Sequence, residues 1–426
     1  MYKITKLSNG LTVASHHMAG AYSVSVGIWF RVGSRYEDNP RAGISHLLEH
    51  MIFKGSPTYS TDAIKRRIEG SGGQLNGFTS EELTCYLAKV PHKMVRTAFS
   101  ILNDIALYPS LKPAELKKEK TVIIEEIKMY NDLPEHMAQE QLDQLLWPGH
   151  PLGRNIAGSI ETVSSTSRDE LARFQKEYYK PSNMLIVFTG NIHHEDCMRL
   201  VNESLKGKKE TAARHNFTRF SSTQNKPMIK PFIKEIEQTR LAIGFCAYER
   251  MHPKRFAVSL LSVILGGNMS SRLFDKVREK HGLAYAISAH YKRLMDTGAF
   301  YILAGLDNKK IDLALRLIFQ ELAVVKDRPV PQAELKRAKE FVLSQLAMSL
   351  EDTLEHMVFL GEAVATTQKA QDYGYIKKEV EAITPATIQE VARDIFRAEK
   401  ANISLVGTVK DFDAARCGSL LREKLG

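Results

Sequence analysis

The sequence has few cysteines and no long apolar stretch, and both shortages exclude whole classes of protein. Its 426 residues include four cysteines, which show neither CxxC nor paired spacing, so we expect neither a disulfide framework nor a thiolate metal site. No apolar run is long enough to cross a bilayer, and the start, MYKITKLSNGLTV, lacks the charged-then-apolar pattern of a signal segment. We therefore expect a cytoplasmic protein of a reducing compartment, without membrane insertion.

The formal net charge of +10 is the strongest feature of the composition. A basic balance favours acidic peptides, nucleic acid or an anionic surface as partners. Here the basic residues are mixed with acids, as in AELKKEK, and are not interleaved with aromatic residues. Most of this charge is therefore expected to be solvated surface, with steering of acidic substrate segments as the functional alternative, and no nucleic-acid partner is predicted.

One structural pattern occurs twice along the chain. AELKKEKTVIIEEIKMYND, residues 114–132, resembles AELKRAKEFVLSQLAMSLED, residues 333–352, and each half ends with a helix followed by a β-branched strand. Each half also has an early strand, YSVSVGIWFRVGS or TRLAIGFCAYER, and in the first of them alternating Val24, Val26 and Ile28 indicate one buried face. The predicted fold class is α+β, with two homologous sandwich-like domains, each a mostly antiparallel sheet with helices packed on it.

The polar segment RHNFTRFSSTQNKPMIKP, residues 214–231, lacks periodicity and is predicted to be a linker. It separates an N-terminal domain of residues 1–213 from a C-terminal domain of residues 232–426. Two pseudo-equivalent domains joined in this way can face each other across a cleft, which is a common place for a site.

The segment HLLEH, residues 46–50, gathers two histidines and a glutamate inside an apolar stretch. Apolar residues at helical spacing predict a helix that ends near Gly55. At about 3.6 residues per turn, His46 and His50 lie one above the other on one face, with Glu49 beside that edge. Two imidazoles and a carboxylate are therefore expected at one spot.

Two histidines leave a zinc site incomplete, because catalytic zinc usually takes three protein ligands. The segment PAELKKEKTVIIEEIKMY is predicted to be one helix, on which Glu125 falls on the wet side. Glu126 falls in a mostly apolar stripe with Glu119, Val122, Ile123, Met129 and Tyr130. A carboxylate in such a stripe needs a partner, and a metal would be one; Glu119 could then orient a ligating histidine.

The second copy of this helix is an internal control. Aligned without gaps, it has Ala338 opposite Glu119 and Gln345 opposite Glu126, and nothing like HLLEH occurs in the second half. The helix is repeated but its acids are not. This pattern is expected if one half carries the chemistry and the other shapes the cleft.

At these residues the sequence resembles a known family. H-x-x-E-H followed by a distant glutamate is the inverted zinc motif of the pitrilysin/insulysin (M16) zinc metallopeptidases, and the chain is similar to their half-length branch, which includes the mitochondrial processing peptidase subunits and bacterial relatives. The resemblance covers essentially the whole chain and extends to GGQLNGFTSEELTCYLAKVP, HPLGRNIAGS and SSRLFDKVREKHGLAY.

The resemblance implies one Zn²⁺ per chain and a role for each site residue. The implied metal ligands are His46, His50 and Glu126, with Glu49 as the general base and Glu119 as an outer acid.

Substrate contacts are implied in both halves. The segment QLNGFTSEELTCYLAKV is predicted to be a strand, and the resemblance makes it an exposed edge to which the substrate backbone adds, with Asn76, Gly77 and Phe78 in contact with substrate. In the second half, Arg278 would hold a substrate carbonyl and Tyr285 would donate to the developing oxyanion.

The implied function is a zinc endopeptidase that hydrolyses extended peptides or unstructured segments in an enclosed chamber, commonly closed by two chains. Because this chain has both the zinc motif and the Arg/Tyr pair, a homodimer is favoured over a heterodimer with a related chain. The alternative is a noncatalytic scaffold or partner subunit of the same family. A bacterial cytoplasmic protein is expected, with a mitochondrial matrix protein freed of its presequence as the alternative.

Overall fold

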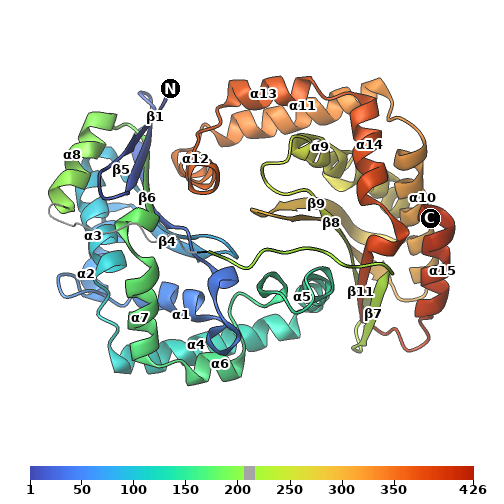
Figure 1. Cartoon of the computed structure of the whole chain (residues 1–426), viewed down its shortest axis with the longest axis horizontal. Coiled ribbons are helices and arrows are strands. Elements are labelled where there is room, and N and C mark those ends of the chain that lie inside the picture. Colours follow the sequence, from blue (N-terminus) through green and yellow to red (C-terminus); the bar gives the residue numbers. More distant parts are fainter. Residues whose placement is uncertain (206–215) are drawn as a thin grey trace. The chain divides into compact units, whose positions relative to one another are not determined.

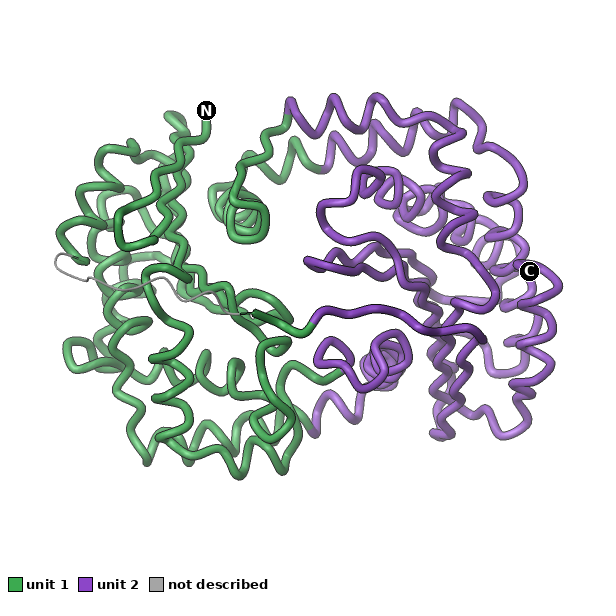
Figure 2. Tube along the Cα trace, viewed as in Figure 1, with its two compact units in different colours: residues 1–127, 154–218, 346–373 green, residues 128–153, 219–345, 374–426 purple. Residues whose placement is uncertain are grey.

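The computed structural model describes residues 1–205 and 216–426, which form two compact units. Unit 1 comprises residues 1–127, 154–218 and 346–373, and unit 2 comprises residues 128–153, 219–345 and 374–426 (Figure 2). The end of the predicted N-terminal domain and the first two residues of the predicted linker lie outside the described residues. The units are not two consecutive halves, because one segment after residue 127 joins unit 2 and one after residue 345 joins unit 1.

The sheet of unit 1 is mostly antiparallel, and β2 and β6 are its parallel neighbours. Within the described residues it runs in the order β1-β2-β6-β3-β5-β4. Its strands are β1 (Tyr2–Lys6), β2 (Thr12–His17), β3 (Ser23–Phe30), β4 (Gln74–Thr79), β5 (Thr84–Pro91) and β6 (Met184–Gly190). β4 is therefore an edge strand, a position that leaves one row of backbone groups without a neighbouring strand.

Strand β3 is buried on both faces, not on one as its alternation predicted. Val24, Val26 and Ile28 pack in a core with helices α1 (Ile44–Ile52) and α3 (Val95–Leu107). On the opposite face, Trp29 is 1% exposed and packs against helix α12 (Thr353–Thr367). A helix from the second half of the sequence thus covers the face that the first half leaves open.

Within the described residues, unit 2 repeats the topology of β2 to β6, and β1 has no counterpart in it. Its described strands run in the order β7-β11-β8-β10-β9, with β7 and β11 parallel and the other neighbours antiparallel. Figure 1 labels β7, β8, β9 and β11 of this sheet. The strands are β7 (Met228–Ile233), β8 (Gln238–Ala247), β9 (Ala284–Arg293), β10 (Gly298–Asp307) and β11 (Ala401–Gly407). Helix α5 (Pro134–Leu146), from the first half of the sequence, packs on this sheet through Leu142 and Leu146. The predicted fold class of two homologous, mostly antiparallel sheets with packed helices is confirmed.

The remaining helices surround the sheets. Unit 1 also has α2 (Thr61–Ile68), α6 (Ile160–Ser165), α7 (Arg168–Tyr178) and α8 (His194–Ser204), and unit 2 also has α9 (Arg255–Gly266), α10 (Ile311–Asp327), α14 (Pro385–Ile395) and α15 (Ala414–Leu425). The long α4 (Pro113–Asp132), its counterpart α11 (Gln332–Ser349) and the short α13 (Tyr373–Glu381) cross the unit boundaries. In the described part of the chain, no helix has both the length and the apolar content that a membrane span requires.

Two local predictions need correction. The stretch QLNGFTSEELTCYLAKV is not one strand but a hairpin, in which residues 80–83 connect the edge strand β4 to the inner strand β5. Thr84 and the residues after it belong to the inner strand β5, so the exposed edge is β4 alone. The end of the predicted linker, residues 228–231, is not irregular, because it belongs to β7 and pairs with β11.

Candidate metal centre

Helix α1 carries HLLEH and is held at its N-terminus by a buried acid. Gly43 precedes the helix with φ +93°, a left-handed conformation that favours glycine. The Glu37 carboxylate accepts the N–H groups of Gly43 and Ser45, each at 2.8 Å. It thereby satisfies two backbone donors at a helix start that has no side-chain cap of its own. Burial raises the pKa of Glu37 to about 7, although these hydrogen bonds act in the opposite direction.

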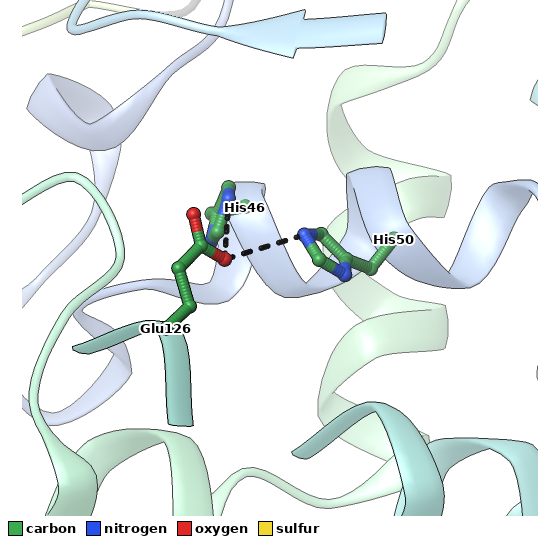
Figure 3. A group of neighbouring side chains, drawn as sticks. All are labelled: His46, His50 and Glu126. Atoms are coloured by element: carbon green, nitrogen blue, oxygen red, sulfur yellow. Dashed lines mark ion pairs between the residues drawn. The ribbon is translucent and has the colours of Figure 1, made fainter. Parts of the chain in front are cut away.

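The structure brings His46, His50 and Glu126 together (Figure 3). The Nε2 atom of His46 lies 3.9 Å, and that of His50 3.8 Å, from the same Glu126 Oε2. One possible donor atom from each of the three residues lies within 4.8 Å of the others. Ligand atoms around tetrahedral zinc lie about 3.3 Å apart for bonds near 2.0–2.1 Å. A small contraction of this cluster would therefore fit the ion, and the two-imidazole, one-carboxylate set suits zinc.

The protonation of His46 also suits a metal ligand. Burial, with a smaller contribution from the neighbouring His50, lowers the pKa of His46 to about 4. A histidine with this pKa is neutral at pH 7, so a ring nitrogen keeps its lone pair for a metal.

His50 is oriented by the predicted outer acid. Its Nδ1 lies 3.1 Å from Glu119 Oε2, and the other carboxylate oxygen of Glu119 accepts from Lys54 Nζ at 2.7 Å. A histidine that donates Nδ1–H to a carboxylate presents Nε2 to a metal, which is a common arrangement behind zinc ligands. Glu119 is 6% exposed, and its pairing with a lysine and a histidine explains how a carboxylate is kept at this depth.

The apolar stripe predicted for helix α4 is only partly buried in the structure. Val122 and Met129, both expected in the buried stripe, are about half exposed. The buried face of α4 consists of Leu116, Glu119, Ile123 and Ile127. Glu126 lies at the border of this face, half-buried, and Glu125 is exposed as expected. The choice of Glu126 over Glu125 agrees with the structure, but the reason is its position at this border.

Glu49 is buried beside the cluster and held by the edge hairpin. Thr79, the last residue of β4, donates its hydroxyl to Glu49 Oε2 at 2.5 Å. Burial raises the pKa of Glu49, Glu126 adds to this effect, and the Thr79 hydrogen bond and His50 oppose it. The base candidate and the edge strand are thus joined by one hydrogen bond.

The substrate-strand candidates lie on β4. Asn76 is exposed, and its side chain accepts the backbone N–H of Gly77 at 2.8 Å. A Cβ at Gly77 would lie 3.0 Å from the Phe53 ring, so glycine lets the strand lie close to the end of α1. Phe78 packs edge-on against Trp29 at 5.4 Å between ring centroids.

Arg278 and Tyr285 lie in unit 2, near each other. Arg278 is in the π-helical segment Phe274–Glu279, and its guanidinium carbon lies 4.5 Å from the centroid of the Phe274 ring and 5.8 Å from that of the Tyr285 ring. Tyr285 is 74% exposed and lies at the start of edge strand β9. The predicted pair is therefore a pair in space within its unit.

Sequence reasoning missed three residues that support the site, namely Glu37, Lys54 and Thr79. Thr79 was inside the strand segment, but its link to Glu49 depends on the hairpin that the segment was not expected to form. Lys54 lies four residues after His50, so helical spacing could have suggested it. Nothing in the local pattern singles out Glu37, because its hydrogen bonds are made across an irregular connection.

Comparison with known proteins decides the family. The family model described as insulinase, peptidase family M16, matches residues 12–159, and the model described as peptidase M16 inactive domain matches residues 165–342. The chain belongs to the M16 peptidase family. The metal cluster lies within the first match, and Arg278 and Tyr285 lie within the second.

Relatives of similar length carry zinc-protease names. The chain is 33% identical to the uncharacterized zinc protease YmxG of Bacillus subtilis over 94% of this chain and 97% of that one. It is 31% identical to an uncharacterized zinc protease of Rickettsia bellii over 95% and 97% of the two chains. A protease from Helicobacter pylori shares the fold with a TM-score of 0.90 at 20% identity, over 96% of this chain and 99% of that one. These M16 relatives agree with the predicted half-length branch.

Proposed function

We propose that this M16 chain is a zinc-dependent endopeptidase of the inverted H-x-x-E-H type, acting on extended peptides or unstructured segments. The observation that carries the proposal is the convergence of His46, His50 and Glu126 from two separate helices, with the Glu49 carboxylate beside them. Membership of the family and the zinc-protease names of full-length relatives support it.

His46, His50 and Glu126 would hold one Zn²⁺ per chain. Bound zinc would supply a water of lowered pKa and a Lewis acid for the peptide carbonyl. Glu119 accepts from Nδ1 of His50 and so fixes the tautomer that leaves Nε2 free for the ion. Three protein donors also leave a fourth position open, as catalytic zinc requires.

Glu49 would act as the general base. Its Oε2 already accepts the Thr79 hydroxyl, which fixes the plane of the carboxylate and leaves Oε1 to take a proton from the attacking water. The same atom can later deliver that proton to the leaving amine. Because the acid is buried, few solvent molecules compete for this proton.

Strand β4 would bind the substrate backbone as an added strand. Its edge position and the exposed Asn76 support this proposal, together with the hydrogen bond from Thr79 to Glu49 at its end. In unit 2, Arg278 would hold a substrate carbonyl and Tyr285 would donate to the oxyanion, in a chamber enclosed around the peptide. The exposure of the Tyr285 ring agrees with a group that awaits a ligand.

For the assembly we propose a homodimer, because one chain carries the zinc motif and the Arg/Tyr pair together. A heterodimer with a related chain is the other arrangement. In light scattering of the chain purified alone, the mass of a dimer would support the homodimer, and the mass of a monomer would support the heterodimer. A cytoplasmic location agrees with the bacterial sources of the relatives.

The function is tested by zinc content and peptide cleavage measured on the same preparations. The unmodified chain should hold one zinc and cleave an unstructured peptide. Glu49→Gln should keep the zinc, because Glu49 is not part of the donor cluster, and should lose about 10²- to 10⁴-fold in kcat.

If the chain is instead a noncatalytic scaffold of the same family, the cleavage experiment should give a different result. If the zinc-loaded chain cleaves no peptide from an unstructured library, or if Glu49→Gln cleaves as well as the unmodified chain, the peptidase proposal is wrong. The scaffold alternative would then stand.

A further inference from the structure

Unit 2 contains a recess that the proposed chemistry does not use. It measures about 60 Å³ and lies between the start of α5 and strands β8, β9 and β10 of the second sheet. Its lining includes Glu135, Arg240, Ala286, Ser288, Ala304 and Gly305. Leu241 and Leu303 also line it, and the remaining uncharged side chains are small, so they leave room beside Arg240.

The register of the sheet explains the shape of the recess. Gly305 of β10 pairs with Arg240 of β8 on one side and with Ala286 of β9 on the other. Paired residues point to the same face of a sheet, so this row has one long side chain, one absent side chain and one methyl group. The result is a shallow floor bordered by the backbone of Arg240 at one end.

Arg240 lies across this floor. A Cβ built on Gly305 would lie 2.3 Å from Arg240 Nη1, so the guanidinium occupies the space directly above the glycine. Among the described residues, the Arg240 side chain has no hydrogen-bond or ion-pair partner. A half-buried guanidinium with five free donors is suited to a planar, two-oxygen acceptor.

Glu135 limits which acceptor fits. It lines the same recess from the first turn of α5, and its side chain is exposed. With one positive and one negative group, the recess would repel a polyanion more than a single negative charge. Its small volume likewise favours a carboxylate over a larger phosphorylated group.

The recess lies next to a proposed substrate-contacting residue. Ala286 lines it, and the preceding residue, Tyr285, is the extra residue where the register between β9 and β10 shifts. Bulges of this kind re-aim a side chain and occur near active sites. A peptide held by Tyr285 would therefore have a neighbouring residue within reach of Arg240.

We propose that this recess binds one carboxylate of the peptide substrate, recognised by Arg240. The carboxylate can come from the peptide's C-terminus or from an Asp or Glu side chain, since both present the same two oxygens. The inference rests on the proposed function in two respects: the ligand is taken to be a peptide, and Tyr285 is taken to contact it.

The test measures peptide binding without turnover. Fluorescence anisotropy on the full chain with Glu49→Gln compares two matched pairs of labelled peptides: a free C-terminus against a C-terminal amide, and an internal Glu against Gln. We expect the carboxylate member of at least one pair to bind about tenfold more tightly. The pair that shows this preference identifies the source of the carboxylate.

Variants assign the preference to the recess. Arg240→Gln should abolish it, Arg240→Lys should restore part of it, and Glu135→Gln should increase it because a competing negative charge is removed. Gly305→Ala keeps the arginine but displaces its guanidinium, and should weaken the preference several-fold. Arg337→Gln, at an exposed position on α11, is the control with the same change of charge.

The outcomes separate this inference from the peptidase proposal. Equal affinities in both peptide pairs, or a preference that survives in Arg240→Gln and Gly305→Ala with unchanged thermal melting, would overturn the recess assignment. A carboxylate preference that depends on Arg240, in a zinc-loaded chain that cleaves nothing, would support the recess while removing the peptidase activity.

Discussion

The two halves of this chain share one strand order but differ in the face of one repeated helix. Both sheets place a parallel pair next to three antiparallel neighbours in equivalent positions. In α4 the buried Glu119 and the half-buried Glu126 lie toward the site, whereas the equivalent positions of α11 hold a buried alanine, Ala338, and an exposed glutamine, Gln345. Because Ala338 is 4% exposed, the repeated helix can bury an alanine at this position, and the fold does not need an acid there. The acids of α4 are therefore best explained by chemistry.

The largest effect on zinc affinity should come from replacing Glu126 of α4 with the glutamine that α11 has at the equivalent position, Gln345. Glu126→Gln keeps the shape of the side chain but replaces the anionic ligand with an amide. Zinc affinity should fall by about 100- to 1,000-fold, or about 3–4 kcal/mol, which is one ligand's share of a typical zinc-binding free energy. Competition with a fluorescent chelator measures the change.

Glu125→Gln is the matched control, because Glu125 is the exposed neighbour on the same helix. It should leave zinc affinity within about twofold. Equal losses in the two variants would mean that the helix, and not the Glu126 carboxylate, determines binding.

A second difference between the halves concerns how the equivalent helices begin. Helix α1 starts at the buried Glu37 carboxylate, and α9, which follows the corresponding strand of unit 2, has Lys254 at its N-cap. The pKa of Glu37 is raised to about 7 in the folded protein, so the folded state binds a proton more tightly than the unfolded chain. The free energy of unfolding should then fall by about 3 kcal/mol as the pH rises from about 4.5 to 7, and level off above that.

Urea unfolding of the metal-free chain at several pH values measures this slope. Glu37→Gln should remove this contribution to the slope, since a glutamine does not titrate. A variant whose stability has the same pH dependence as the unmodified chain would show that Glu37 stays ionised throughout.

Replacing Glu119, the acid behind His50, should lower zinc affinity less than replacing Glu126. Glu119→Ala gives α4 the residue that α11 has at the equivalent position, Ala338. It leaves His50 Nδ1 and Lys54 without the carboxylate that they contact. Zinc affinity should fall by about 10- to 100-fold. Isothermal titration of the metal measures it, and Glu115→Ala, on the same helix, is the control. If affinity is unchanged, Glu119 serves only to neutralise Lys54.

The repeated fold and the grouping of the three candidate metal ligands could be predicted from the sequence, because both depend largely on periodic patterns. His46 and His50 follow from helical spacing, and Glu126 from the missing third ligand and the family spacing. Thr79 and Glu37 could not be predicted, because their roles depend on a hairpin and an irregular connection with no periodic signal. The sequence pattern also did not predict that α5, from the first half, covers the second sheet, or that α12, from the second half, covers the first sheet. Each helix is amphipathic, but nothing in the helix itself says which sheet it covers.

The packing of these two helices on their sheets can be compared with one pair of glycines, Gly27 of β3 and Gly244 of β8. A Cβ at Gly27 would lie 2.4 Å from Met357 Sδ of α12 and 2.8 Å from Trp29 Nε1, whereas a Cβ at Gly244 would lie 3.0 Å from Leu146 and 3.1 Å from Leu142 of α5. Gly27→Ala should destabilise the chain by about 1–3 kcal/mol through overpacking. Gly244→Ala should cost less, about 1 kcal/mol or below, because leucine methyl groups a few tenths of an ångström too close can shift. Thermal unfolding of both variants measures the difference. Equal losses would mean that α12 packs no more tightly against β3 than α5 packs against β8, despite the shorter distances at Gly27.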